Sequence, residues 1–572
     1  MPLGNGDIGL NVWARADGTL HLLISKTDAW DDNSRLVKVG KVVVRFDPNP
    51  FAGDFRQELD LATGSISLQR KIRVWVDAHH PVIHITTELP ASASIELWRT
   101  NRWELTRLEV SDILLNRKKP QQKEAPTFVE PDTLLNATTW YHYNTRSVGP
   151  GITARIQGLD GFRQPDPIRH RIFGGKVVKT SSGFDIFVLT QHPSTPQRWL
   201  ASMDALIRRT GPPDFEAHKR WWTEFWDRSW IHAKTNTNAP SVALQPASVN
   251  HQLQRVGQDP LGRNRFATAL SDEAAYVSQM YALQRFINAC AGRGAHPIKF
   301  NGSLFTVPHE GDPDYRRWGP GYWWQNTRLP YLSMCASGDF DLMKPLFRMY
   351  AEQLLPLCKY RTKLYCGHEG AFYPECMYFW GAIFSDTYGW TPFEQREDKL
   401  QESRYHKWEW VGGLELCWLL LDYYEHTLDR VFLQKTVLPF CREILTFFDQ
   451  HYKNGPDGKL ILQPAQALET WWECTNPMPE LAGCIAVSER LMTLTADPFY
   501  RRFRARLPPL PLRDINGKKA LAPAEKFDIK RNSENPELYA VFPFRLIAVG
   551  KPNIEWGLEA LRHRWNKGDF GW

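Results

Sequence analysis

One short stretch, Leu462 to Asn476, concentrates residue types that could perform acid catalysis. It reads LQPAQALETWWECTN and holds two carboxylates, Glu469 and Glu473, beside Trp471 and Trp472. A carboxylic acid desolvated among indole rings has a raised pKa, which a general acid needs near neutral pH. Flat aromatic faces beside it suit the apolar face of a sugar ring. The same letters also fit the start of a buried helix, and a helix would put both carboxylates on one face.

Further candidate acids and bases lie in aromatic, glycine-rich loops ahead of that stretch. Glu375 stands in GHEGAFYPECMYFWG, Asp386 in FSDTYGW and Glu409 in RYHKWEWVGG. Glu375 is the strongest candidate for a second catalytic group because aromatic residues flank it. A capping or solvated carboxylate is nevertheless the commoner role for such residues. His406 and Trp408, which neighbour Glu409, are candidate sugar contacts.

The composition is that of a large globular protein with many aromatic residues. At 572 residues the chain is too long for one hydrophobic core. Its 24 Trp, 30 Phe and 19 Tyr suit either carbohydrate-handling surfaces or large cores. The net charge of +7 is spread along the chain, and the densest basic run, RRFRAR, precedes a proline-rich loop. No nucleic-acid partner is therefore predicted.

No segment predicts a membrane span, a cofactor or a metal site. Apolar runs fall short of the roughly 20 residues that cross a bilayer, and the first residues do not resemble a signal peptide. The nine cysteines, all at or after Cys290, have irregular spacing, which favours buried free thiols over disulfides or zinc. His368 and His451 could be ligands or sugar-binding donors, although an isolated histidine is more often structural.

Residues 1–205 predict an antiparallel β-sandwich. Short alternating apolar runs are separated by clusters of Gly, Pro, Asn and Asp without intervening helices, which is typical of that fold. The opening PLGNGDIG is a turn set before a strand that starts at Ile8. The clearest predicted strands are Leu20–Ile24, Val37–Phe46, Ile72–Val76, Val82–Thr86 and Phe184–Leu189.

Residues 206–268 predict a helical linker that includes a polar loop over 234–265. Asp214 can cap its helix, which carries an aromatic stripe. A further helix is predicted from Ser271. The buried stripe expected on that helix consists of Tyr276, Met280, Leu283 and Ile287.

Residues 269–572 predict helical hairpins joined by loops rich in Trp, Tyr, Asn and Glu. Two segments are loosely alike, SGDFDLMKPLFRMYAEQLLPL from Ser337 and HTLDRVFLQKTVLPFCREILTFF from His426. Each has an acidic residue before an apolar run, then Pro, then an amphipathic helix. Such recurrence favours stacked hairpins, and we expect an α/α toroid with its site in the loops.

Several stretches resemble glycoside hydrolase family 95. The opening Pro2–Gly9 resembles the N-terminal signature of that family, and Lys26–Trp30 stands where its acidic-tryptophan segment follows. Trp221–Ser229 resembles the helix that links sandwich to barrel, and Trp323–Tyr331 resembles the family's Asn-x-Asn segment. The loop around Glu469 resembles the one that carries the family's general acid. The likeness covers patches over nearly the whole length, as in a divergent branch of the family.

The resemblance implies a multidomain β plus α fold and a mechanism. It implies an N-terminal β super-sandwich over residues 1–205, a helical linker over 206–268 and an (α/α)6 six-hairpin toroid over 269–572. It also implies an inverting glycosidase, in which one carboxylic acid protonates the leaving oxygen and a second group activates a water on the opposite face. Family members include α-L-fucosidases and relatives acting on α-galactosides, and they imply a secreted or periplasmic location.

Carried over residue by residue, the resemblance makes Glu469 the general acid and Asn326 the amide that holds the attacking water. Trp324 stands in place of the family's first asparagine, and the family's downstream aspartate has no counterpart before the chain ends at GDFGW. Either the chain is incomplete within its toroid or the base is recruited elsewhere, and we expect Glu375 to serve as the substitute. The side chains expected to bind sugar are Trp323, Trp324, Arg328, Tyr331, His406, Trp408, Trp471, Trp472 and Glu473.

The predicted function is hydrolysis of an α-linked glycosidic bond in an oligosaccharide or polysaccharide, without metal or cofactor. A degenerate, non-catalytic carbohydrate-binding protein is the first alternative, because the first asparagine and the aspartate are missing. A polysaccharide lyase is the second, although in lyases with both parts the toroid precedes the sandwich.

Overall fold

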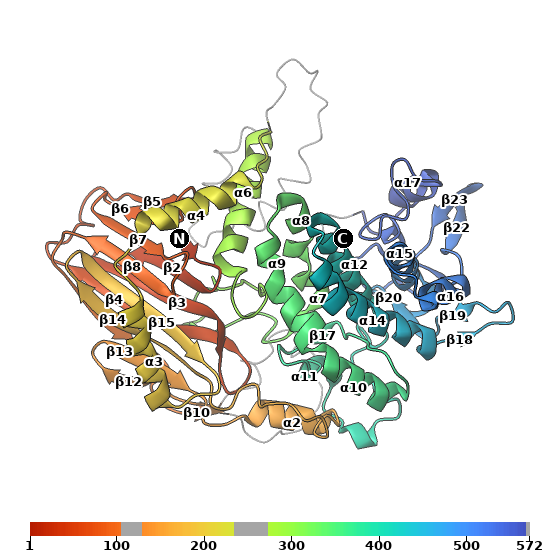
Figure 1. Ribbon diagram of the computed structural model, residues 1–572, viewed down its shortest axis with the longest axis horizontal. Helices are drawn as coiled ribbons and strands as arrows, with labels where there is room; N and C mark the ends of the chain where they lie inside the picture. Colours follow the sequence, from red (N-terminus) through yellow and green to blue (C-terminus); the bar gives the residue numbers. More distant parts are fainter. Residues whose placement is uncertain (105–127, 234–272, 568–572) are drawn as a thin grey trace, which may run out of the picture.

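The chain folds as antiparallel β-sheets followed by a helical region. The computed structural model describes residues 1–104, 128–233 and 273–567 (Figure 1). The predicted order, sheets first and helices second, is confirmed. Residues 234–265, predicted as a polar loop, lie outside the described residues.

The first sheet has five strands, and its interior side chains are aliphatic. In β2, buried Leu10 and Val12 alternate with half-buried Asn11 and Trp13, whereas β3 is buried along nearly its whole length. The opening turn lies between the first two strands as predicted. In spatial order the strands are β1 (Pro2–Gly4), β2 (Ile8–Ala14), β3 (Thr19–Trp30), β4 (Leu36–Phe46) and β9 (Ala91–Glu96).

The second sheet has eight strands and packs on the first across one shared core. Trp140 joins the two, since its Nε1 donates to the carbonyl of Val39 at 2.8 Å. The adjacent Gly40 is required there, because a Cβ would lie 2.5 Å from the Trp140 Nε1. In spatial order the strands are β12 (Thr133–Asn136), β13 (Thr139–Tyr143), β14 (Ile172–Thr180), β15 (Gly183–Gln191), β8 (Val82–Thr87), β7 (Ile72–Val76), β6 (Ser65–Leu68) and β5 (Gln57–Asp60). A short ribbon pairs β10 (Trp103–Glu104) with β11 (Phe128–Val129).

Three helices accompany the sheets: α2 (Val148–Ile156), α3 (Pro196–Arg209) and α4 (Phe215–Asp227). α3 covers β14 and β15 with Trp199, Met203 and Leu206. The predicted cap of α4 is confirmed, since the Asp214 carboxylate accepts from the backbone N of Ala217 at 2.8 Å.

The helix predicted from Ser271 is described as α6 (Glu273–Ala291), but most of its predicted buried stripe is wrong. Of the predicted stripe, Tyr276, Met280 and Leu283 are exposed and only Ile287 packs against the core. The buried residues are instead Phe286, Ala289 and Cys290. The physical reason is that the first half of α6 projects beyond the packed body while its last turns meet β1 and β2 (Figure 1).

The helical region is built around α12 (Val411–Thr427), whose residues 411–423 are all buried. A helix buried on every side belongs in the centre of a domain. α12 packs against α14 (Leu438–His451) and α15 (Met478–Leu494). In turn, α14 packs against α10 (Leu355–Cys366), and α15 packs against α16 (Pro498–Arg506). The other helical segments are α7 (Trp324–Thr327), η2 (Leu329–Tyr331), α8 (Met334–Ser337), α9 (Phe340–Phe347), η3 (Arg348–Gln353), α11 (Ser385–Tyr388), η4 (Phe393–Gln395), α13 (Arg430–Phe432), η5 (Leu433–Val437), η6 (Pro536–Leu538) and α17 (Ile554–Arg562).

Small sheets lie between these helices. The three-stranded one contains β20 (Ala465–Ala467), β21 (Trp471–Pro477) and β24 (Ala524–Phe527). The two-stranded ones pair β16 (Tyr322–Trp323) with β17 (Cys376–Met377), β18 (Lys453–Asn454) with β19 (Leu460–Ile461), and β22 (Leu512–Ile515) with β23 (Lys518–Leu521).

The two segments that look alike in sequence also fold alike. In the first, α9 runs through the π-helical η3 into α10; in the second, α13 runs through the π-helical η5 into α14. Each π-helical turn lies just ahead of a Leu-Pro pair at the start of the next helix. Because π-turns are rare, their recurrence at one position supports the predicted repetition.

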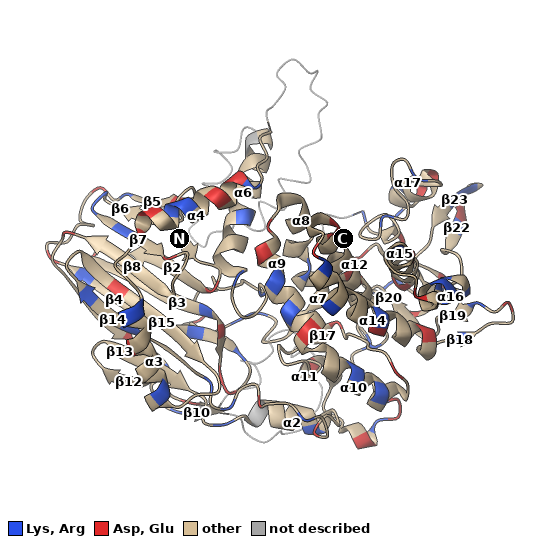
Figure 2. Cartoon of the chain, viewed as in Figure 1, with Lys and Arg blue, Asp and Glu red and all other residues tan. Residues whose placement is uncertain are grey.

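Polar contacts fasten the sheets to the helical region. Gln157, just after α2, exchanges two hydrogen bonds with the backbone of Ile383, at 2.6 and 3.0 Å. The buried Arg99 contacts Asp314 at 2.7 Å, and Asp314 also accepts from the backbone N of Lys38 at 2.8 Å. Lys, Arg, Asp and Glu are interspersed over both halves (Figure 2).

Candidate active site

Glu469 lies in the turn between β20 and β21 rather than on a helix. The turn needs Leu468 in the left-handed region, at φ 54°, and residues from Trp471 onward are strand. The helix considered for this stretch is therefore wrong, because pairing with β20 and β24 holds it extended. Alternation along β21 turns Glu473 to solvent, where it pairs with Arg404.

A second chain segment, residues 531–534, is bound to this turn. The backbone N of Arg531 donates to the carbonyl of Thr470 at 2.9 Å, and the Thr470 hydroxyl donates to Glu534 Oε2 at 2.6 Å. In the same segment Asn532 Nδ2 donates to Glu469 Oε2 at 2.8 Å. These bonds hold Glu469 and Glu534, which are far apart in sequence, in neighbouring segments.

Gln325, in the first turn of α7, connects Glu534 to Glu375. Its backbone N donates to Glu375 Oε1 at 2.7 Å, and its side-chain amide donates to Glu534 Oε1. The neighbouring residue, Asn326, is half-buried. The structure thus brings three predicted residues, Glu375, Asn326 and Glu469, into one region and adds Glu534.

His406 and Glu409 complete the cluster in front of α12. His406 Nδ1 lies 3.3 Å from Glu409 Oε2 and 3.8 Å from Glu469 Oε1. Glu409 Oε1 is buried without a hydrogen-bond partner among the described residues. Since Glu409 stands just before α12, the helix N-terminus favours negative charge at this place. We name Glu375, Glu409, Glu469 and Glu534 the carboxylate cluster.

Arg328 supplies a positive charge beside the carboxylate cluster. It forms a buried ion pair with Glu415 of α12 and donates to the hydroxyl of Tyr539 at 3.0 Å. Glu415 also accepts from Trp324 Nε1 at 2.6 Å. Trp324 and Arg328, both predicted sugar contacts, therefore hold a carboxylate of the protein.

Burial raises the pKa of every carboxyl in the cluster, and like charges add to the effect. The pKa values of Glu375 and Glu409 lie well above the ordinary value for glutamate, with burial the larger cause and neighbouring carboxylates the next. Burial raises the pKa of Glu469 to about 7, an effect that His406 opposes and Glu534 adds to. Burial also raises the pKa of Glu534, but hydrogen bonds from Thr470 and Gln325 oppose it.

Glu469 is the member of the cluster with the most accessible carboxyl. Its side chain is 21% exposed, whereas residues Glu375, Glu409 and Glu534 are each 2% exposed. Burial lowers the pKa of His406, which favours its neutral form near pH 7. A partly accessible carboxyl with a pKa of about 7, among buried carboxylates, can donate a proton to a bound molecule.

Glu480, in the first turn of α15, lies behind the cluster and provides a test of these electrostatics. Its Oε1 accepts from the backbone N of Trp410, and burial raises its pKa to about 8 from 4.5. The folded state therefore keeps a proton that the unfolded chain loses above pH 4.5, so stability falls as the pH rises from there to about 8. We expect Glu480→Gln to match the parent near pH 4 and to be more stable at pH 9 by on the order of 3–5 kcal/mol.

Chemical denaturation at both pH values measures this difference. Glu489→Gln is the matched control, since Glu489 lies on the same helix with a half-exposed side chain paired to Arg504. It should change stability little at either pH. Equal stability of the Glu480→Gln protein and its parent at pH 9 would contradict the raised pKa.

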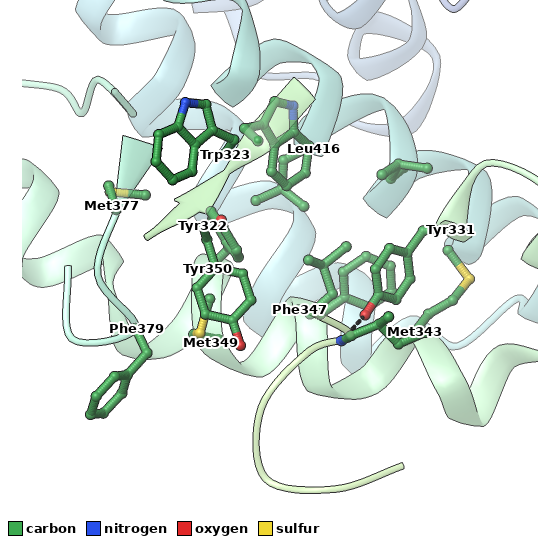
Figure 3. Close-up of a cluster of buried hydrophobic side chains, with 14 of the residues drawn as sticks. Tyr322, Trp323, Tyr331, Met343, Phe347, Met349, Tyr350, Met377, Phe379 and Leu416 are labelled. Carbon is green, nitrogen blue, oxygen red and sulfur yellow. Dashed lines mark hydrogen bonds between the residues drawn. The ribbon is translucent and has the colours of Figure 1, made fainter. Parts of the chain in front are cut away.

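The aromatic side chains predicted to bind sugar divide into buried and accessible groups. Tyr331 is fully buried beside Met343 and Phe347, and its hydroxyl accepts from the backbone N of Ile298 (Figure 3). Trp323 is buried as well, against Phe300, Trp318 and Phe384, and Trp471 is buried against Phe527 and Trp565.

Trp408 and Trp472 remain half-buried beside the cluster. Trp472 Nε1 donates to the carbonyl of Glu469 at 2.8 Å, which fixes the indole next to the acid. The Arg531 guanidinium lies 4.7 Å from the centre of that ring. These two tryptophans are therefore the half-buried members of the predicted aromatic set.

Sequence reasoning did not identify Glu534, Gln325 or Asn532. Their roles come from hydrogen bonds between distant segments, such as the one from Gln325 to Glu534. One local signal was present: RNSENPELY joins amides and carboxylates to a proline in a loop, as active-site loops often do. Glu409 was considered but ranked below Glu375, and the structure places both in the cluster.

A cavity of about 650 Å³ lies elsewhere, beside α15 and α16. None of its lining residues belongs to the carboxylate cluster. None of the described helices has both the length and the apolar character needed to cross a membrane.

Comparison with known proteins gives limited matches. Residues 1–182 match a family model described as a domain of unknown function, DUF5703. No curated protein matches. A solved structure described as a "putative kojibiose phosphorylase from human microbiome" is similar with a TM-score of 0.47 and 10% sequence identity. The likeness covers 89% of this chain and 63% of that one.

Proposed function

We propose that this protein cleaves a glycosidic bond by general acid catalysis, with Glu469 as the acid. The observation that carries the proposal is that hydrogen bonds from Thr470 to Glu534 and from Asn532 to Glu469 tie the two carboxyl-bearing segments together. The carboxyl of Glu469 is accessible and has a pKa of about 7. Glu534 accepts two hydrogen bonds, which favour its ionised form. An accessible carboxyl that holds its proton near neutral pH, beside a carboxyl whose ionised form accepts hydrogen bonds, is suited to act as the acid of such a pair.

In this proposal the reaction inverts the anomeric carbon. Glu469 gives its proton to the glycosidic oxygen as the bond from that oxygen to the anomeric carbon breaks. A water attacks the opposite face of the sugar, and Glu534 takes the proton that this water loses. Asn326, next to Gln325, is proposed to orient the water with its amide. Release of the two sugars and exchange of protons with solvent restore both carboxyls.

Glu375 is the other candidate for the base, as expected from the sequence. Its Oε1 accepts one hydrogen bond from a backbone N, and burial raises its pKa well above the ordinary value. A base must be ionised before the reaction, so the carboxylate with more hydrogen bonds is favoured. We therefore assign Glu534 as the base and give Glu375 the role of holding Gln325 in place through its backbone hydrogen bond.

The proposed substrate is an α-linked sugar, such as an α-L-fucoside or α-galactoside, in an oligosaccharide or polysaccharide. His406, Trp408 and Trp472 are proposed to contact the sugar, because they lie beside Glu469 and the tryptophans keep accessible faces. The (α/α)6 toroid is proposed as the framework, since the repeated π-turn segments and the central α12 suit stacked hairpins. A panel of α-linked glycosides, with the first-formed anomer identified by NMR, tests this function. Sugar binding without hydrolysis would favour a carbohydrate-binding protein, and an unsaturated uronide would indicate a lyase.

Substitution of the two candidate bases distinguishes them. We expect Glu534→Gln to lower kcat by about 10²–10⁴-fold on both activated and natural glycosides, because both need the attacking water deprotonated. Glu375→Gln should lower it by less than about tenfold. Azide should restore the turnover of an activated substrate by the Glu534→Ala variant, because azide can occupy the space left by the glutamate side chain. The opposite ranking of the two glutamine variants would move the base to Glu375.

A further inference from the structure

A second group of donor atoms lies at the ends of two neighbouring helices and has no part in the proposed hydrolysis. α10 ends at Cys366 and α14 ends at His451, while His368 lies in the loop just after α10. One donor atom from each of these three side chains lies within 4.8 Å of the other two. All three side chains are half-buried, so a small ion from solvent can reach them.

The donor types are those that zinc prefers. Zinc binds thiolate sulfur and imidazole nitrogen, and tetrahedral coordination separates such donors by roughly 3.3–3.6 Å. Small side-chain rotations bring donors within 4.8 Å to that spacing. Free thiols were predicted for all nine cysteines and are found, but Cys366 alone among them is not buried. It is therefore the cysteine best placed to meet a metal ion.

The hydrogen bonds of His368 prepare it as a ligand. Its Nδ1 lies 2.8 Å from the carbonyl of Glu369, and a carbonyl can only accept, so Nδ1 carries the proton. The lone pair is then on Nε2, which lies 3.0 Å from Nδ1 of His451. A histidine that donates its second nitrogen to a backbone carbonyl is the usual arrangement in metal sites.

His451 is also held in place. Its ring stacks on Phe447, with ring centroids 4.7 Å apart and an angle of 21° between the ring planes. Before a metal binds, Nδ1 of His451 donates to His368, so it must be protonated there. Metal binding requires that proton to move to Nε2 of the same ring, which keeps the imidazole neutral. The Cys366 thiol loses its proton to solvent, and no oxidation is involved.

We propose that Cys366, His368 and His451 form a zinc site, with a water as the fourth ligand. Bound zinc joins the end of α10 to the end of α14 and fixes the loop that begins at Gly367. That loop continues to Glu375 in the carboxylate cluster. Cysteine spacing cannot reveal such a site in the sequence, because two of its three ligands are histidines. One of them, His451, lies on a different helix from Cys366.

Cobalt titration of the metal-free full-length protein tests the site. We expect one cobalt ion per chain, with thiolate-to-cobalt charge-transfer absorption and the visible bands of tetrahedral cobalt, both lost when zinc is added. Cys366→Ser should abolish the charge-transfer band. Cys366→Ser and His451→Asn should each weaken cobalt binding by at least tenfold, because even the loss of an outer-shell partner weakens metal binding by about 10–100-fold. Zinc should raise the apparent Tm of the parent and not of these variants.

His426→Asn is the matched control, because His426 is exposed in the last turn of α12 and is not among the proposed ligands. It should bind cobalt as the parent does. Circular dichroism establishes that each variant is folded. Absence of stoichiometric cobalt binding by the folded parent, or an unchanged charge-transfer band in Cys366→Ser, would overturn the proposal.

Discussion

Glu469→Gln is expected to lower kcat on a natural, unactivated glycoside by about 10²–10⁴-fold while leaving the fold intact. Glutamine keeps the shape of the side chain but has no acidic proton to give the leaving oxygen. An activated substrate with a good leaving group needs little protonation, so its turnover should fall much less. Steady-state kinetics with both substrate types measures the difference, and the Tm reports on the fold.

The pH dependence of the same variant gives a second measurement. An acid must hold its proton, so parent kcat should fall about tenfold per pH unit above the pKa of Glu469, about 7. That alkaline decline should be absent from the residual activity of Glu469→Gln on the same natural glycoside. Glu473→Gln is the matched control, because this exposed side chain lies only four residues away on β21. Activity of Glu469→Gln within a few-fold of the parent on a natural glycoside would remove Glu469 from the mechanism.

Arg328→Met is expected to lower the free energy of unfolding by about 3–5 kcal/mol. Arg328 is 5% exposed and pairs with Glu415, which is 3% exposed, so its removal leaves a buried carboxylate without its cation. It also removes the donor to Tyr539. Chemical denaturation, followed by the fluorescence of the tryptophans in the helical region, measures the change.

Two further variants establish the cause. Adding Glu415→Gln to Arg328→Met removes the unpaired charge and should recover part of the loss. Arg404→Met breaks an ion pair whose side chains are 50% and 60% exposed, and it should cost less than about 1 kcal/mol. A loss in Arg328→Met no larger than in Arg404→Met would show that the buried pair contributes little.

The β half could be predicted from sequence because its signals are local. Alternating apolar residues place the five clearest strands, and each is found where expected. The cap at Asp214 is local in the same way. The stripe on α6 failed because periodicity shows which faces of a helix are apolar, but not where the helix leaves the packed body.

The candidate site could be predicted only in part, for a physical reason. Glu469 and Glu375 lie in aromatic loops that attract notice in the sequence. Glu534 is held by hydrogen bonds from Gln325 and Thr470. Both residues are distant from it in sequence, and no sequence pattern predicts these contacts. The stretch after Glu469 was open to a helical interpretation because WWEC has no clear period, and only its pairing partners decide that it is strand.

The fastening of residues 531–534 onto Thr470 has a consequence for synthesis on the ribosome. Sheets and central helices are made first, and domains generally fold in that order as the chain emerges. Glu469 is then present long before the ribosome reaches Asn532, which donates to its carboxyl, and Glu534, which accepts from the neighbouring Thr470. The growing chain therefore carries three of the four cluster carboxyls before Glu534 is added. The mutual repulsion of all four carboxyls therefore arises only after most of the surrounding core has packed.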